Sequence, residues 1–128
     1  LQTADFITIN CAYNPKLHHM IDEEQFKMMK KTAYIVNASR GPIMHEAALA
    51  HALKTNEIEG AALDVFEFEP KITEELKGLK TVVLAPHVGN ATFETRDAMA
   101  EMAVRNILAV LKGEEPVTPV NQKAVVTK

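Results

Sequence analysis

The stretch that decides the fold is "AYIVNASRGPIMHEAALAHALKTNEIEGAALDV", which runs from Ala33 to Val65. It opens with the run Ala33–Asn37, whose aromatic and β-branched residues are favoured in strands. A helical pattern follows in "HEAALAHALK", where Leu49 and Leu53 share one face and the alanines allow close packing. A second apolar run, Gly60–Val65, closes the stretch. Strand, helix and strand in this order predict a right-handed crossover between two parallel strands.

Two further apolar runs extend this unit on both sides. Phe6–Asn10 lies before it and Thr81–Ala85 lies after it. None of the four runs alternates cleanly between apolar and polar residues. Continuous apolarity is typical of parallel strands that are covered on both faces. The sequence therefore predicts an α/β fold with a parallel sheet of about four strands and flanking helices.

Helix ends can also be located from the sequence. Asp22 and Gln25 form a capping-box pattern that opens "EEQFKMMKK". Thr92 can cap a long C-terminal helix that runs to about Lys112, with Gly113 as its stop. An apolar stripe on this helix is expected to pack into a core. Its members are Met99, Met102, Ala103, Ile107, Val110 and Leu111.

Composition excludes several classes of function. The 128 residues are 47% hydrophobic with a formal net charge of −3, which fits one globular domain without a basic surface for nucleic acid. The longest apolar tract, Ala98–Leu111, is interrupted by Glu101 and Arg105, so no membrane span is predicted. The single cysteine, Cys11, excludes an internal disulfide and suits a reducing compartment. We therefore expect a cytoplasmic protein that binds neither nucleic acid nor membrane.

Polar and charged side chains follow the predicted strands. Arg40 follows the second strand, Glu67 and Glu69 follow the third, and His87 follows the fourth. Ligands of open parallel sheets bind beyond the carboxyl ends of the strands, so these side chains are expected along one edge. An arginine can hold a carboxylate through two parallel hydrogen bonds, and a histidine can transfer a proton near neutral pH. A carboxylate such as Glu69 can orient the imidazole and favour its charged form, so the set suits reduction of a ketone beside a carboxylate.

Each of these residues also has a simpler interpretation. Arg40 can be an ordinary loop cation, His87 a hydrogen-bonded loop residue, and Asp64 the cap of a turn. Glu67 and Glu69 lie two positions apart, and solvent exposure is the default expectation for both.

The remaining histidines and the cysteine give weaker signals. His18 and His19 are adjacent, His45 stands at the start of a predicted helix, and His51 lies within it. No pair has metal-ligand spacing, so no metal site is predicted. Cys11 is more simply a small buried residue than a nucleophile.

Three segments follow, in order, the signature regions of a known family: "MKKTAYIVNASRGPIMHEAALAHAL", "IEGAALDVFEFEP" and "LAPHVGNAT". From about Ala4 to Asn121 the chain resembles the carboxyl-terminal half of the cofactor domain of D-isomer-specific 2-hydroxyacid dehydrogenases. The resemblance implies a partial Rossmann-like sheet, with residues 1–112 in the dinucleotide-binding domain and 113–128 as a C-terminal tail. It also implies an NAD- or NADP-dependent oxidoreductase that is a homodimer at full length. Its substrate would be a small 2-keto or D-2-hydroxy acid, and glyoxylate, hydroxypyruvate, pyruvate and branched keto acids all stay open.

The resemblance assigns roles residue by residue. Arg40 looks like the anchor of the substrate carboxylate and carbonyl, and His87 looks like the proton donor to the keto oxygen. Glu69, directly before Pro70, looks like the partner of that histidine, a role that Glu67 would not hold. Asp64 is similar to the residue that holds the nicotinamide carboxamide. The full set of implied cofactor contacts is Cys11, Ala12, Asn37, Ala38, Ser39, Asp64 and Gly89.

The sequence departs from the family in two places. Ala12, Tyr13 and Asn14 stand where the family usually has proline, leucine and threonine, and His45 stands where an acidic helix cap is common. Both departures leave the catalytic set intact, but they weaken inference about the adenosine side of the cofactor and about substrate choice.

Part of the family pattern is missing from these residues. There is no G-x-G-x-x-G turn and no acidic residue placed to bind the ribose, which lie earlier in the family's cofactor domain. We therefore expect the chain to be a fragment that is inactive by itself. The run Phe6–Asn10 is expected at a sheet edge, covered by another chain or by the tail. An NAD(H)-sensing protein like the carboxyl-terminal-binding-protein corepressors stays open as an alternative. Formate dehydrogenase is disfavoured because it has glutamine at the position of Glu69.

Overall fold

The computed structural model describes residues 1–120, and residues 121–128 lie outside its described part. The chain divides into two compact units, of which the first is Leu1–Gly89 and the second begins at Asn90. The predicted tail, 113–128, therefore falls partly on residues that are not described. The predicted domain boundary after residue 112 stays a prediction.

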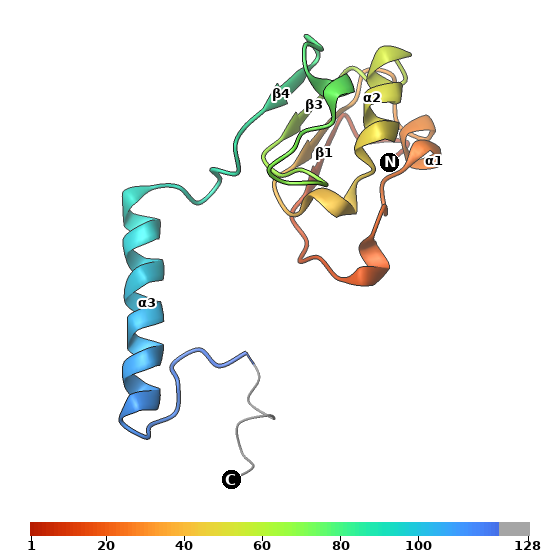
Figure 1. The fold of residues 1–128 in the computed structure, drawn as a ribbon. Coiled ribbons are helices and arrows are strands. Elements are labelled where there is room, and N and C mark those ends of the chain that lie inside the picture. The colour runs from red at the N-terminus through yellow and green to blue at the C-terminus, as the bar shows by residue number, and fades with distance from the viewer. Residues whose placement is uncertain (121–128) are drawn as a thin grey trace. The chain divides into compact units, whose positions relative to one another are not determined.

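One sheet organises the first unit (Figure 1). Its four strands are parallel and lie in the order β1-β2-β3-β4, which confirms the predicted α/β fold. Each strand lies inside the run expected from the sequence, and the bounds are β1 Phe6–Ile9, β2 Tyr34–Asn37, β3 Gly60–Leu63 and β4 Val82–Leu84. Ile9 pairs with Asn37, Asn37 with Leu63, and Leu63 with Leu84. The strands therefore end side by side, and the loops that follow them meet at one edge.

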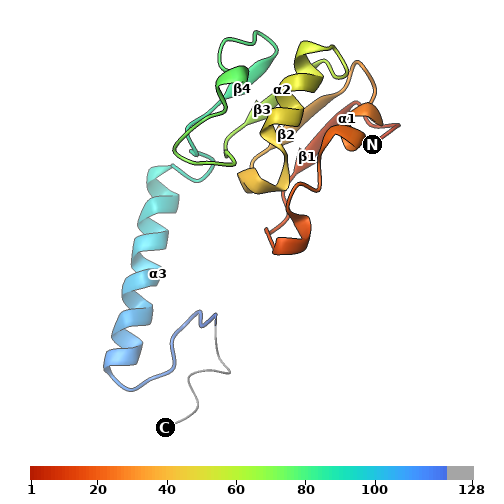
Figure 2. The ribbon, with the colours of Figure 1, turned by 45° about the vertical axis from the view of Figure 1, so that its right-hand side comes forward.

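Two α-helices connect successive strands and lie on the same face of the sheet (Figures 1 and 2). They are α1, Glu23–Lys27, and α2, Glu46–Lys54. Because the strands follow one another in one direction, right-handed crossovers place both helices on one face. The capping box of α1 forms as predicted, since Gln25 accepts a 3.1 Å hydrogen bond from the backbone N–H of Asp22.

Short 3-10 turns complete the connections, and a single apolar core lies between the helices and the sheet. The turns are η1 Pro15–Leu17, η2 Gly41–Ile43 and η3 Glu74–Leu76. Fully buried side chains from every layer meet in this core, among them Phe26, Ile35, Ile43, Leu49, Leu63 and Leu76. This core fixes the sheet and the loops at its carboxyl edge.

The other face of the sheet is not covered within the first unit. Phe6 and Val83 are 75% and 68% exposed there, and the Phe6 ring stacks on Tyr34 at a centroid distance of 5.6 Å. The expectation that both faces are covered is therefore wrong for this unit, because all its crossovers lie on one side. β1 is at the edge of the sheet, and among the described residues no strand pairs with its outer side. The expected cover for this edge stays a prediction.

The second unit contains the long helix α3, Phe93–Leu111. Thr92 caps it by accepting a 3.2 Å hydrogen bond from the N–H of Thr95, and Gly113 follows it with a φ of +77°, both as predicted. Within the described part of this unit its apolar stripe is exposed, with Ile107 and Leu111 at 59% and 77%. The expected packing of this stripe into a core stays a prediction. Among the described residues no helix is long and apolar enough to cross a membrane.

Candidate active site

The loop after β2 is held by a buried amide. Asn37 is fully buried, and its Oδ1 accepts a 3.1 Å hydrogen bond from the N–H of Ser39 while its Nδ2 donates to the carbonyl of Arg40 at 3.1 Å. The hydroxyl of Ser39 donates to the carbonyl of Cys11, so the ends of β1 and β2 are tied together. Cys11 itself is exposed, which makes its interpretation as a buried residue wrong.

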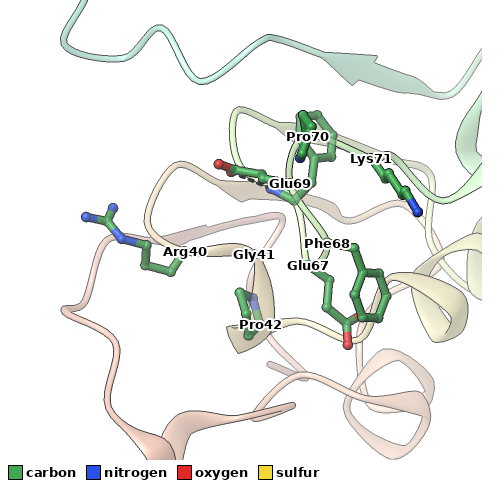
Figure 3. Close-up of a pocket in the computed structure, with 9 residues that line it drawn as sticks. Arg40, Gly41, Pro42, Glu67, Phe68, Glu69, Pro70 and Lys71 are labelled. Atoms are coloured by element: carbon green, nitrogen blue, oxygen red, sulfur yellow. Dashed lines mark hydrogen bonds between the residues drawn. The ribbon is translucent and has the colours of Figure 1, made fainter.

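Arg40 extends from this loop at the rim of the sheet (Figure 3). Its Nη1 donates a 2.7 Å hydrogen bond to the carbonyl of Ser39, which leaves most of the five guanidinium N–H donors for a ligand. Two pockets adjoin the side chain. One of about 550 Å³ is shared with Glu69, and one of about 640 Å³ lies beyond β1 and β2. The second is lined by Asn10, Cys11, Ala12, Tyr13, Ala38, Ser39, Arg40 and Pro42.

A glycine lets the loop after β2 touch the loop after β3. A Cβ on Gly41 would lie only 1.9 Å from the carbonyl carbon and oxygen of Phe66. Real Cβ atoms do not approach backbone so closely, so glycine is required here. Arg40 precedes this contact and Glu69 follows it, so the backbone contact holds together the two loops that carry these side chains.

Glu69 lies against His87. The two carboxylate oxygens of Glu69 are 3.2 Å and 3.1 Å from Nδ1 of His87. Oε1 also accepts a 3.0 Å hydrogen bond from the backbone N–H of Phe66. This N–H, and next the imidazole of His87, hold the pKa of Glu69 below its usual value. The carboxylate therefore stays ionised and can hold a proton on the ring nitrogen that faces it.

Asp64 shapes the turn that carries the histidine. Its two carboxylate oxygens accept 2.8 Å hydrogen bonds from the N–H groups of Val88 and Gly89. His87 has a φ of +53°, a region that a non-glycine residue rarely occupies without support from its surroundings. A Cβ on Gly89 would lie 3.0 Å from Oδ2 of Asp64, so glycine keeps this turn close to the carboxylate. The simpler interpretation of Asp64, as the cap of a turn, matches these contacts.

Glu67 is buried, so the expectation of solvent exposure is wrong for this residue. Its side chain is 7% exposed, and its Oε1 lies 2.6 Å from Nε2 of His19. Its Oε2 accepts a 3.2 Å hydrogen bond from the backbone N–H of Glu46. The buried Glu46 carboxylate in turn accepts from the N–H groups of Glu67 and Thr73. Figure 3 shows the carboxylates of Glu67 and Glu69 pointing to different sides of their segment.

Two residues that hold this site were missed by sequence reasoning. Phe66 acts through its backbone N–H, and Glu46 acts from the first turn of α2, so no side-chain motif marks either contact. Glu46 follows His45, which stands where the family commonly has an acidic helix cap. An acidic residue next to that position is the only sequence feature that could have pointed to Glu46.

The comparison with protein families agrees with this geometry. The model of the D-isomer-specific 2-hydroxyacid dehydrogenase NAD-binding domain matches residues 1–89, the same residues as the first compact unit. The chain belongs to this family. The Rossmann-type sheet and the NAD or NADP class of cofactor follow from this membership.

Curated relatives agree with this family assignment. A protein of Staphylococcus aureus strain MRSA252, provisionally named a 2-hydroxyacid dehydrogenase, is 65% identical over 121 residues, which are 94% of this chain and 38% of that protein. The chain thus spans about 38% of the length of the curated relatives it matches.

Solved structures superimpose closely on this chain. The TT0316 protein of Thermus thermophilus is 39% identical with a TM-score of 0.89, over 94% of this chain and 39% of that one. The NADPH-dependent glyoxylate/hydroxypyruvate reductase of Sinorhizobium meliloti, solved with NADP and malonate, is 33% identical with a TM-score of 0.89, over 93% of this chain and 37% of that one. D-mandelate dehydrogenase of Rhodotorula graminis is 37% identical with a TM-score of 0.86, over 93% of this chain and 35% of that one.

The residues at the sheet edge fit a dinucleotide. The pocket beyond β1 and β2 is lined by the small side chains of Ala12, Ala38 and Ser39, which let a flat ligand reach the backbone. It lies outside the carboxyl ends of the parallel strands, where α/β sheets bind their ligands. Of the predicted cofactor contacts, Asn37 is the last residue of β2, and the others lie in the loops that follow β1, β2, β3 and β4.

Proposed function

We propose that the full-length protein reduces a small 2-keto acid with NADH or NADPH and oxidises the matching D-2-hydroxy acid in reverse. The observation that carries this proposal is the pair formed by Glu69 and His87 on the same rim as Arg40. Family membership supports the reaction class. The names of two structural neighbours, a glyoxylate/hydroxypyruvate reductase and a D-mandelate dehydrogenase, support a 2-keto acid as substrate.

His87 is the proposed acid and base. Its Nδ1 faces the Glu69 carboxylate, so Nε2 is the nitrogen available to the substrate. In reduction the imidazolium donates the Nε2 proton to the keto oxygen, and in oxidation the neutral ring accepts it from the hydroxyl. Because Glu69 stays ionised, it stabilises the charged ring and fixes which nitrogen holds the remaining proton.

Arg40 is the proposed substrate anchor. Its planar guanidinium can form two parallel hydrogen bonds with the substrate carboxylate and also stabilise negative charge that develops on the keto oxygen. The nicotinamide supplies or accepts the hydride when the cofactor is bound. The proposed cofactor contacts are Cys11, Ala12, Asn37, Ala38, Ser39, Asp64 and Gly89. We include in the same proposal that the full-length protein is a homodimer in the cytoplasm.

The test is turnover by the full-length protein. Glyoxylate, hydroxypyruvate and pyruvate are offered with NADH or NADPH, and cofactor oxidation is followed by absorbance. We expect the wild type to turn over at least one combination of keto acid and cofactor. The variants Arg40→Ala and His87→Ala should lose this turnover. His51→Ala is the matched control, because His51 is an exposed histidine on α2. The 128-residue chain alone is expected to show no turnover.

Two results would contradict the proposal. One is wild-type turnover in His87→Ala. The other is tight NADH binding by the full-length protein without turnover of any 2-keto acid, which would favour the NAD(H)-sensing, corepressor-like function instead.

A further inference from the structure

Three histidines and two carboxylates form a cluster outside the proposed active site. The rings of His18 and His19 stack at 4.0 Å, and those of His19 and His45 stack at 4.4 Å. Nδ1 of His45 lies 2.8 Å from Oδ1 of Asp22, and Glu67 holds Nε2 of His19. The cluster joins the segment before α1, the start of α2 and the loop after β3.

We propose that His19, Asp22 and His45 bind one divalent transition-metal ion of the Zn²⁺ type. Each of the three side chains offers a ligand atom, and these atoms lie within 4.8 Å of one another. Imidazole nitrogen and carboxylate oxygen are both common Zn²⁺ ligands. In a tetrahedral site with metal bonds of about 2.0–2.1 Å the ligand atoms are about 3.3 Å apart, so the three side chains must draw closer together around the ion.

An ion can reach this site from solvent. A pocket of about 480 Å³ is lined by the three proposed ligands together with Glu23, Glu24 and Gln25. The two glutamates add negative potential at its mouth, which attracts a cation.

Glu67 is placed to orient the proposed ligand His19 without touching the ion itself. A metal-binding histidine usually donates its other ring N–H to a carboxylate, which fixes the ring and makes the free nitrogen a better ligand. Glu67 Oε1 lies 2.6 Å from Nε2 of His19, and this carboxylate is itself buried and held by the N–H of Glu46. Nε2 of His19 is thereby occupied, and Nδ1 is the nitrogen left for an ion.

One ring must turn when the ion binds. The planes of His19 and His45 are only 10° from parallel, so their nitrogen lone pairs point along separate planes and do not meet. Rotation of the half-buried His45 ring about χ2, a torsion with a broad energy profile, brings its nitrogen toward the ion. Binding therefore breaks the His19–His45 stack and the hydrogen bond between His45 and Asp22. The exposed His18 is not needed as a ligand.

The test is calorimetric titration of the full-length protein with Zn²⁺ after treatment with a chelator. We expect His45→Ala to lose one Zn²⁺ site, or to weaken it at least about tenfold, since even outer-shell changes cost about 10–100-fold in metal affinity. Glu67→Gln should weaken binding of Zn²⁺ by about that 10–100-fold. His51→Ala and His18→Ala should bind Zn²⁺ like the wild type. His45 makes no side-chain cap to α2, so the fold should survive its removal, and thermal melting checks this.

Three results would overturn the site. The first is no Zn²⁺ binding by the wild type, and the second is equal Zn²⁺ binding by the wild type and His45→Ala. The third is loss of the ion in His18→Ala with retention in His45→Ala, which would assign it to the other group, His18, His19 and Glu67. None of these results depends on turnover of a keto acid. The proposed Zn²⁺ site can therefore be disproved while the proposed function stands.

Discussion

Nδ1 of His87 lies 3.1 Å from Oε2 of Glu69, although eighteen positions of chain separate the two residues. The carboxylate is held from the other side by the N–H of Phe66. The turn that carries the imidazole is held by Asp64. Backbone N–H groups thus position both members of the pair, and the pair is built into the loops after β3 and β4.

The charge of Glu69 should stabilise the protein in a pH-dependent way. Because the folded pKa of Glu69 is lowered, its stabilising contribution is present above the usual glutamate value of 4.5 and is lost as pH falls through the lower folded pKa. Glu69→Gln keeps an oxygen for the N–H of Phe66 and removes only the charge. We expect the variant to melt below the wild type at pH 7, by a modest margin because the side chain is half exposed.

Melting curves from pH 7 to pH 3 measure this difference. The gap between wild type and Glu69→Gln should close below about pH 4.5. A gap that stays constant over the whole range would show that the charge contributes nothing.

Arg40→Lys tests the geometry of the substrate anchor. Lysine keeps the charge but loses the planar fork that holds a carboxylate with two hydrogen bonds. We expect the KM for the 2-keto acid to rise about tenfold or more, which corresponds to one charge-assisted hydrogen bond of about 1.5–3 kcal/mol. The KM for NADH or NADPH should stay within about twofold, and an equal rise in both would contradict an anchor specific for the acid.

Gly41→Ala tests the contact between the two site loops. The new methyl group would lie 1.9 Å from the backbone of Phe66, so one loop must move. Overpacking costs about 1–3 kcal/mol, and a clash with backbone belongs at the upper end. Urea unfolding should show this loss, whereas Gly78→Ala has open space but a φ of +83° and should show only the smaller cost of that conformation. Equal stability of Gly41→Ala and wild type would refute the close approach.

Asp64→Ala tests how the histidine turn is held. The variant removes the acceptor of two N–H groups, from Val88 and Gly89, and leaves the left-handed conformation of His87 without this support. We expect kcat to fall by at least about tenfold while the fold survives, because a small misplacement of a catalytic group is costly. A change in KM for the cofactor without a change in kcat would show that Asp64 acts only as a cofactor contact and does not position His87.

Much of the fold could be predicted because its signals are local. The capping box of Asp22 and Gln25 and the cap of α3 at Thr92 depend on neighbouring residues alone, and both formed as expected. The four apolar runs located the strands to within a residue or two. The expectation that both sheet faces are covered is wrong within the first unit, because apolar strands such as β4 do not reveal which chain segments cover them.

The site was harder to predict where it depends on distant contacts. The carboxyl ends of parallel strands bring Arg40, Glu69 and His87 to one edge, so their neighbourhood follows from topology. The sequence gives no sign that Glu67 turns away from Glu69 into a partly buried hydrogen bond with His19. Stacking of His19 on His45 likewise depends on how the loop before α1 meets α2, which no spacing along the chain encodes.

A double-mutant cycle between Glu69 and His87 tests the central claim, that these residues act as one acid/base unit. Full-length wild type, Glu69→Gln, His87→Gln and the double variant are compared by kcat/KM for reduction of the best 2-keto acid. His87→Gln should lower the rate by about 10²–10⁴-fold, the usual contribution of general acid–base catalysis. If the residues act together, the double variant will be no slower than His87→Gln alone. If the two losses multiply, Glu69 does not work through His87 and the account is wrong.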